Sequence, residues 1–228
     1  RAIRQAHSAD REGFSAGASF TSVGQRASGV NTNGVTLNYR TDIAVPTGSG
    51  SILGGFKFGG VNYCLRNNAG ATAALLYKST ASGWSEVAMG RKLSFTSGGV
   101  TAITEGQTIT GATSAATAVL TRVMLESGSW AAGTAAGKFI FASQTGTFQS
   151  ENINVGADLN LATIAGNSSA ITLAASGRLE TVVANFGGSV NTNRVYGADG
   201  VNLGFEFDGT VYCPITTGMT SDLPLHVA

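Results

Sequence analysis

The feature that most constrains this chain is a short-range alternation of apolar and polar residues, interrupted every few positions by glycine. Residues 61–66 and 203–207 show the alternation most clearly. Successive side chains of an extended strand point to opposite faces, so this period of two predicts half-buried β-strands. The chain has 32 glycines in 228 residues, about twice the usual ~7%, and glycine weakens long helices. We therefore predict an all-β fold.

Turn signals between these runs predict antiparallel hairpins. Gly59-Gly60 separates two apolar runs and fits a two-residue hairpin turn, and Asp208-Gly209 is the strongest local hairpin signal in the sequence. A first strand is expected near residues 35–39. Four further runs, near residues 52–58, 61–66, 73–77 and 84–87, would form a meander of the kind that builds a β-propeller blade.

Changes in composition divide the chain into four predicted parts. Residues 1–28 form an N-terminal arm ordered by partners, and residues 29–98 form a first blade-like unit. Residues 99–177, poorer in aromatics, form an inserted small β-barrel or sandwich module, and residues 178–228 form a second blade-like unit, complete or incomplete. Residues 56–60 resemble 184–188, which favours two related units around an insertion.

Within the inserted module, two phrases echo each other. Glu105 to Gly111 (EGQTITG) is similar to Glu151 to Gly156 (ENINVG), a weak hint of internal pseudo-symmetry. Between them we predict one strand over Thr117 to Leu125 and another over Gly137 to Ala142.

Charge and cysteine content exclude several classes of partner. Charged residues make up 12% of the chain, about half the usual ~25%, and the net charge is +1, so nothing favours a specific nucleic acid. No apolar run approaches the ~20 residues of a membrane-spanning helix. Cys64 and Cys213 are better interpreted as buried free thiols than as a disulfide.

No residue pattern predicts a catalytic, metal or cofactor site. His7 and His226 are the only histidines and lie near opposite ends, so neither a zinc site nor a Ser-His-Asp triad is expected. Glu206 and Asp208 share a strand face and could form a carboxylate pair, although a solvated face, with Asp208 serving the turn, is the better interpretation. Asp199 lacks the further ligands of a calcium loop.

The aromatic residues allow two interpretations. A sugar-binding platform would use five strand residues, but aromatics on strands are more often core or cross-strand partners; these are Tyr39, Tyr63, Tyr77, Trp84 and Tyr196. Trp130 lies in a Gly/Ala-rich link that offers little bulk to bury it, so it is a candidate contact with a partner or receptor. In the arm, Arg1, Arg4 and Arg11 are candidate interface residues.

Four segments together resemble structural proteins of tailed bacteriophages. Thr104 to Gly156 resembles a small β module of such proteins: TEGQTITGATSAATAVLTRVMLESGSWAAGTAAGKFIFASQTGTFQSENINVG. The flanking phrases resemble propeller-like tail proteins: ILGGFKFGGVNYCLRNNAG, LLYKSTASGWSEVAMGRKLSFTSGG and RVYGADGVNLGFEFDG. The resemblance implies a virion location and no catalytic residues.

From this resemblance we expect a ring-forming subunit of the tail nozzle or tail tip that acts in assembly and in forming the channel for genome delivery. Its partners would be other copies of itself and other tail proteins. The alternatives are a module that binds a receptor or a host surface glycan, a capsid decoration protein and, less favoured, a polysaccharide depolymerase.

Overall fold

The computed structural model describes residues 26–27, 30–31, 44–96, 98–185, 193–216, 218 and 222–227. The predicted arm with Arg1, Arg4 and Arg11 therefore lies almost wholly outside the described residues. So do His7, Tyr39 and the strand predicted near residues 35–39.

The chain divides into two units. One comprises residues 1–46 and 79–85, and its described parts are the short ladder of β1 (Arg26–Ala27) with β2 (Val30–Asn31) and the tip of the hairpin formed by β5 and β6. The other comprises residues 47–78 and 86–228 and contains the sheets discussed below.

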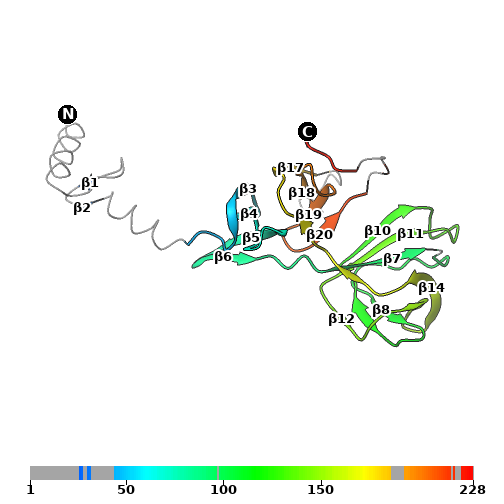
Figure 1. Cartoon of the computed structure of the whole chain (residues 1–228). Helices are drawn as coiled ribbons and strands as arrows, with labels where there is room; N and C mark the ends of the chain where they lie inside the picture. Colours follow the sequence, from blue (N-terminus) through cyan, green and yellow to red (C-terminus); the bar gives the residue numbers. More distant parts are fainter. Residues whose placement is uncertain are drawn as a thin grey trace. The chain divides into compact units, whose positions relative to one another are not determined.

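The described residues form strands and no helix, and every pairing is antiparallel, as the sequence predicts (Figure 1). No helix long and apolar enough to cross a membrane occurs in this part of the chain. The remaining strands are β3 (Ser49–Phe58), β4 (Val61–Asn67), β5 (Ala73–Thr80), β6 (Gly83–Glu86), β7 (Arg91–Thr96), β8 (Thr108–Gly111), β9 (Thr117–Val119), β10 (Arg122–Ser127), β11 (Ala136–Phe141), β12 (Gln144–Thr145), β13 (Ser150–Val155), β14 (Asp158–Ala165), β15 (Ser169–Ala170), β16 (Leu173–Ala174), β17 (Glu180–Ala184), β18 (Arg194–Ala198), β19 (Phe205–Phe207) and β20 (Tyr212–Pro214).

Two small sheets carry the meander pattern. One has the order β16-β5-β4-β3 with β6 paired to β5, and the other runs β17-β18-β19-β20 in sequence order. Gly59 and Gly60 both have positive φ, as a two-residue hairpin turn of this kind requires, so the predicted turn is confirmed. At the second predicted hairpin, Asp208 accepts hydrogen bonds from the Thr210 and Val211 amides and closes the turn.

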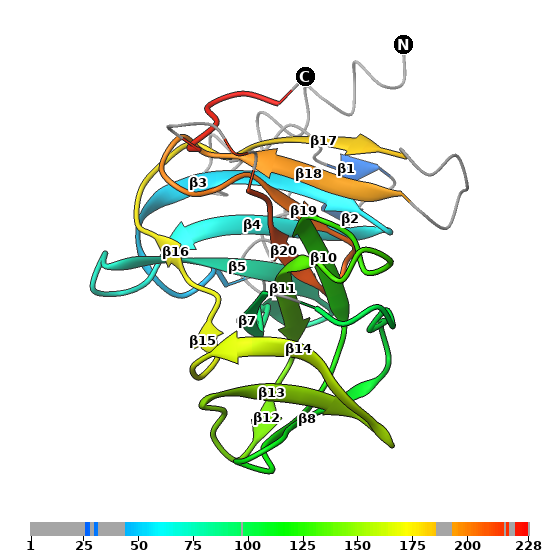
Figure 2. The ribbon, with the colours of Figure 1, turned by 90° about the vertical axis from the view of Figure 1, so that its right-hand side faces the viewer.

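The third sheet has nine strands and surrounds a core of its own. Its order is β10-β11-β7-β14-β13-β8-β9-β12, with β15 also paired to β7, and among the described strands no pairing closes it into a barrel. In Figure 2, four strands of this sheet lie at the opposite end of the second unit from β17 and β18; they are β8, β12, β13 and β14. The sheet includes β7, which precedes residue 99, whereas β16, at residues 173–174, pairs with β5.

Two hydrophobic clusters fill the interior. The first core lies inside the nine-stranded sheet and consists of Leu93, Phe95, Ile103, Ile109, Ala116, Ala118, Leu120, Ala135, Phe139, Phe141, Phe148, Ile153, Leu161, Ala162 and Ile164. The second core lies between the two small sheets and consists of Tyr63, Leu65, Ala74, Leu76, Val87, Ile140, Ile171, Leu173, Leu179, Val195, Phe205, Phe207, Tyr212 and Cys213.

Strand β11 connects these two cores. Phe139 and Phe141 belong to the first core, whereas Ile140 between them belongs to the second. Because neighbouring strand residues point to opposite faces, β11 is buried on both faces. The nine-stranded sheet therefore packs against the small sheets through the outer faces of β10 and β11, which contribute Met124 and Ile140 to the second core.

One detail of residues 99–177 differs from the prediction. The single strand predicted over residues 117–125 is two strands, β9 and β10, separated at Leu120, whose side chain is buried in the first core. Each of the two echoed phrases contains one strand. The strands within them, β8 and β13, pair with each other.

Glu151 is buried and fixes the loop before β9. Its carboxylate accepts hydrogen bonds from the amides of Thr113, Ser114 and Gln149 and from the Ser114 hydroxyl. Burial opposes ionisation, but the hydrogen bonds from Ser114, Gln149 and Thr113 outweigh it and lower the pKa from 4.5 to about 2.

Glu151→Gln should therefore destabilise the protein at neutral pH by about 1–3 kcal/mol, because the amide cannot accept all four hydrogen bonds. A carboxylate with a lowered folded-state pKa stabilises the fold above its unfolded pKa of 4.5 and loses that contribution as the pH falls towards 2. Urea unfolding between pH 7 and pH 2.5 should show the two proteins converging on acidification. Glu86→Gln, at an exposed position, is the control; a gap that stays constant with pH would contradict the assignment.

Candidate functional site

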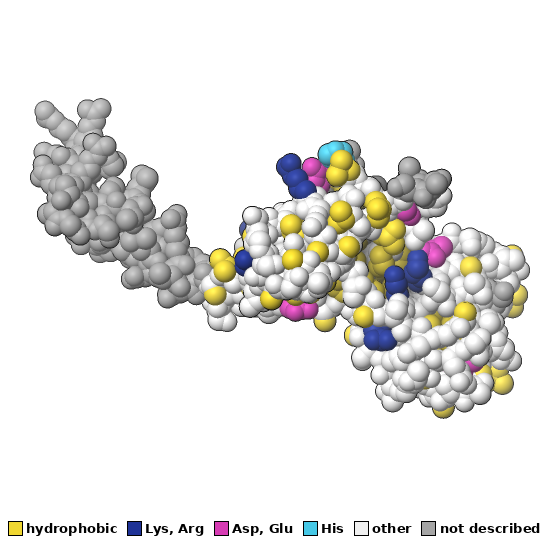
Figure 3. All heavy atoms as spheres, in the orientation of Figure 1, with side chains coloured by type: hydrophobic (Ala, Val, Ile, Leu, Met, Phe, Trp, Pro, Cys, Tyr) yellow, Lys and Arg dark blue, Asp and Glu magenta, His cyan; other side chains and the backbone are white. Residues whose placement is uncertain are grey.

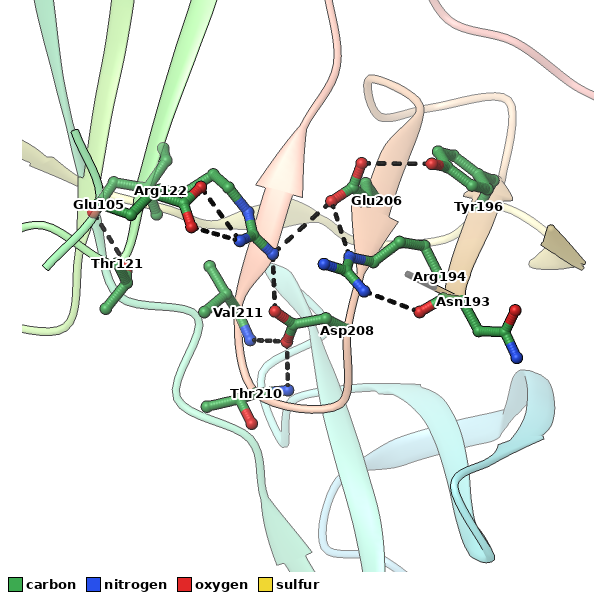
Figure 4. Close-up of polar contacts among 11 residues, drawn as sticks. Glu105, Thr121, Arg122, Asn193, Arg194, Tyr196, Glu206, Asp208, Thr210 and Val211 are labelled. Carbon is green, nitrogen blue, oxygen red and sulfur yellow. Dashed lines mark hydrogen bonds and ion pairs between the residues drawn. The ribbon is translucent and has the colours of Figure 1, made fainter. Parts of the chain in front are cut away.

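The densest cluster of charged side chains lies where the nine-stranded sheet meets the β17–β20 sheet (Figure 4). Arg122, the first residue of β10, donates from Nη1 to both carboxylate oxygens of Glu105 at 3.1 and 3.0 Å. Its Nη2 donates to Oδ2 of Asp208 on the β19–β20 turn at 2.6 Å and lies 3.7 Å from Oε1 of Glu206. One guanidinium group therefore joins two sheets.

A second arginine completes the cluster from within the β17–β20 sheet. Nε of Arg194 lies 3.3 Å from Oε1 of Glu206, and the Tyr196 hydroxyl donates to the other oxygen of Glu206 at 3.3 Å. Three carboxylates and two guanidinium groups therefore interact in a region where the Arg122 and Asp208 side chains are 17% and 19% exposed.

The surroundings of Arg122 and Asp208 keep both groups charged. Burial alone would raise the pKa of Asp208, but the backbone amides of Val211 and Thr210, together with Arg122, lower it. Burial would lower the pKa of Arg122, but Glu105 above all raises it beyond its ordinary value. Nε of Arg122 is buried without a hydrogen-bond partner among the described residues.

This arrangement corrects the predicted solvated face for Glu206 and Asp208. Both side chains are largely withdrawn from solvent, because arginines from two strands pack over them; the predicted role of Asp208 in the turn is confirmed. A glycosidase needs one carboxyl group whose pKa is raised so that it can donate a proton. Asp208 has the opposite shift, and an ion pair already engages Glu206.

The Asp199 carboxylate is likewise occupied by protein groups. It is buried and accepts from the amides of Val201 and Asn202 and from the Asn202 side chain. Across the described residues, no group of three or more His, Cys, Asp or Glu side chains could hold a metal ion. Asp199 therefore shapes the loop between β18 and β19.

Trp130 packs against the molecule's own first core. Its ring stacks on Phe95 with centroids 5.3 Å apart and an interplanar angle of 14°. A side chain at Gly98 would collide with the indole, so this glycine makes room for the stack. The side chain is partly buried, and its exposed part remains the candidate partner contact.

The remaining candidate residues differ in how far they are buried. Tyr63 and Tyr77 are buried, as the core interpretation predicts, while Trp84 and Tyr196 are partly buried. Cys64 and Cys213 are free and buried on strands, which confirms the prediction, and burial raises the pKa of each thiol to about 11. His226 contacts Glu180 through Nδ1 at 2.9 Å and remains exposed.

Sequence reasoning missed the cations of the charged cluster. Arg122 lies 86 positions from Asp208 in the sequence, so no local pattern links the two residues. The one signal for a buried cation was an arginine within a strand that is otherwise mostly apolar. Glu105 begins an echoed phrase, and that pattern gives no indication of its ion pair with Arg122.

Comparisons of this chain with protein-family models, with curated proteins and with solved structures found no match.

Replacing Arg122 by Met should destabilise the protein by about 2–4 kcal/mol, because Asp208 and Glu206 would remain in place without their shared cation. Lys57→Met, at an exposed position, should change the free energy of unfolding by less than about 0.5 kcal/mol. A double-mutant cycle with Asp208→Asn should give a coupling energy of at least about 1 kcal/mol. Additive effects in urea unfolding would show that the two side chains do not stabilise each other.

Proposed function

We propose that this chain is a structural component of a bacteriophage virion, a ring-forming subunit of the tail nozzle or tail tip. The resemblance of residues 104–156 and of the flanking phrases to tail proteins motivates the proposal. The structural observation that carries it is that the candidate carboxylates Glu206, Asp208 and Asp199 are all held by arginines or backbone amides. Arg122 joins two sheets and Asp199 holds the loop between β18 and β19, and such structural roles for charged groups favour a function in shape and assembly.

Within this proposal, β3–β6 and β17–β20 are blade-like units, and the region 99–177 is an inserted small barrel-like module. The four antiparallel strands β17–β20, adjacent in sequence order, have the connectivity of a propeller blade. The nine-stranded sheet surrounds its own core, as a barrel does. Propellers carry at least about four blades, so a complete ring would draw on other copies or on further chain.

The surface supports assembly in a particle that persists outside a cell. On the face in Figure 3, charged side chains cover little of the surface and gather in small groups. Large apolar side chains are exposed on several elements, including Val119, Leu159 and Val183 at 56%, 64% and 50%. Sparse charge lowers the desolvation cost of close contacts, and paired antiparallel sheets leave few free edges.

Native mass spectrometry of the chain at about 10 µM should show one cyclic oligomer, because a heterologous interface that closes gives a ring of fixed number. Imaging of purified phage particles with an antibody against the chain should place that ring on the tail. A strictly monomeric protein that is absent from purified particles would reject the proposal.

The stacking of Trp130 on Phe95 favours one alternative, a module that binds a glycan on the host surface. An aromatic face held rigidly by a core and partly exposed can stack on a sugar ring with little loss of side-chain entropy.

If this alternative holds, Trp130→Ala should lower binding to host envelope glycans at least about tenfold on an array. Trp130→Phe removes the indole but keeps an aromatic ring on Phe95, so it alters the exposed surface with less disturbance of the core. Leu159→Ala, at an exposed position outside the stack, is the control. Thermal unfolding of each variant reports folding. No binding of the unaltered chain to any envelope fraction would exclude the alternative.

A further inference from the structure

Three residues from neighbouring strands lie in one row on the outer face of the nine-stranded sheet. Arg122 of β10 is paired with Ile140 of β11, and Ile140 is paired with Lys92 of β7. Residues directly opposite each other in an antiparallel pair share a face. Ile140 is buried in the second core, so Arg122 and Lys92 flank it on the face that meets the small sheets.

The two cations of this row have different surroundings. Arg122 is neutralised by Glu105, Asp208 and Glu206. Lys92 is partly buried, and the described residues supply no ion pair or side-chain hydrogen bond to its ammonium group. A partly withdrawn cation without an anion is an unusual feature in a chain with so few charges.

Lys92 lines a hollow of about 260 Å³ in which the other lining residues are mainly apolar. The apolar lining comes from the segment before and within β16, the β18–β19 loop and the C-terminal segment: Ile171, Leu173, Val201, Leu203 and Leu223. A cavity of this size has room for a small molecule with a short apolar chain.

The hollow is also lined by Tyr212 of β20, which supplies a second polar group. This residue is 2% exposed, and burial raises the pKa of its phenol well above the ordinary value, so it stays protonated. Within the described part of the chain, the Tyr212 hydroxyl makes no hydrogen bond to a protein group. It is not a fully buried atom without a partner, so part of it is accessible. Asn202, also in the lining, is already engaged by Ala174 and Asp199.

We propose that this hollow, which we call the Lys92 pocket, binds a small apolar molecule that ends in a carboxylate. The ammonium of Lys92 and the hydroxyl of Tyr212 would bind the carboxylate, and the apolar lining would cover the chain. Lys92 is the one charged side chain among the lining residues, and it favours an anion. The nearby Asp199 carboxylate, which contributes to the raised pKa of Tyr212, is not a lining residue and is already engaged by Asn202 and by the Val201 and Asn202 amides.

Octanoate is the probe. Titrated into the ¹⁵N-labelled full chain, it should shift the amides of residues 171–173 and 201–203 with an apparent Kd near 1 mM, as expected for a ligand of about ten heavy atoms. Octanol and octylammonium, which have the same chain and no negative charge, should bind at least about tenfold more weakly.

Two variants assign the polar contacts. Lys92→Met keeps most of the apolar stem and should weaken octanoate at least about tenfold, and Tyr212→Phe should weaken it about three- to tenfold. Lys78→Met, at an exposed position outside the pocket, should leave the affinity unchanged. Thermal unfolding without ligand identifies any variant that fails to fold.

The affinities of the unaltered chain for octanoate, octanol and octylammonium test the proposal without any variant, so a misfolded variant does not remove the test. Equal affinity for octanoate and octanol, or octanoate binding unaffected by Lys92→Met, would overturn the proposal. So would the absence of any shift at 10 mM octanoate. None of these outcomes bears on assembly into a ring.

Discussion

The structure depends on β11, a strand that is buried on both faces. β7 and β11 present Leu93, Phe95, Phe139 and Phe141 to the core of the nine-stranded sheet, while Ile140 enters the core of the two small sheets. The strict period of two in an extended chain makes this possible, because a shift of one residue would exchange the two sets. The register of β7 on β11 therefore fixes the packing of the nine-stranded sheet against the small sheets.

The charged cluster follows from the same register. Arg122 lies beside Ile140 on the outer face, where an unpaired guanidinium group would be costly to withdraw from water. Glu105 from the turn before β8 and Asp208 from the β19–β20 turn supply the compensating charge, and Asp208 is itself held by backbone amides. Buried ion pairs often add little net stability, but their geometry excludes alternative packings in which a charge lacks a partner.

Local features of the fold were predictable from the sequence, and long-range ones were not. The alternation at residues 61–66 and the Gly59-Gly60 turn predict β4 and its hairpin, because both depend on neighbouring residues. The assignment of β7 to the nine-stranded sheet and of β16 to a small sheet depends on pairing with distant strands. Among the candidate site residues, the turn function of Asp208 is a local property, whereas its ion pair with Arg122 is not.

The contrast between Arg122 and Lys92 separates a structural cation from a candidate binding cation. They occupy equivalent positions on either side of Ile140, so the strand pairing alone does not distinguish them. The partners make the difference: acidic groups surround Arg122, whereas apolar side chains and a phenol surround Lys92. A cation that only served packing would gain stability from a carboxylate of the same chain. No described residue supplies such a carboxylate to Lys92, and this is the reason to seek the negative charge in a ligand.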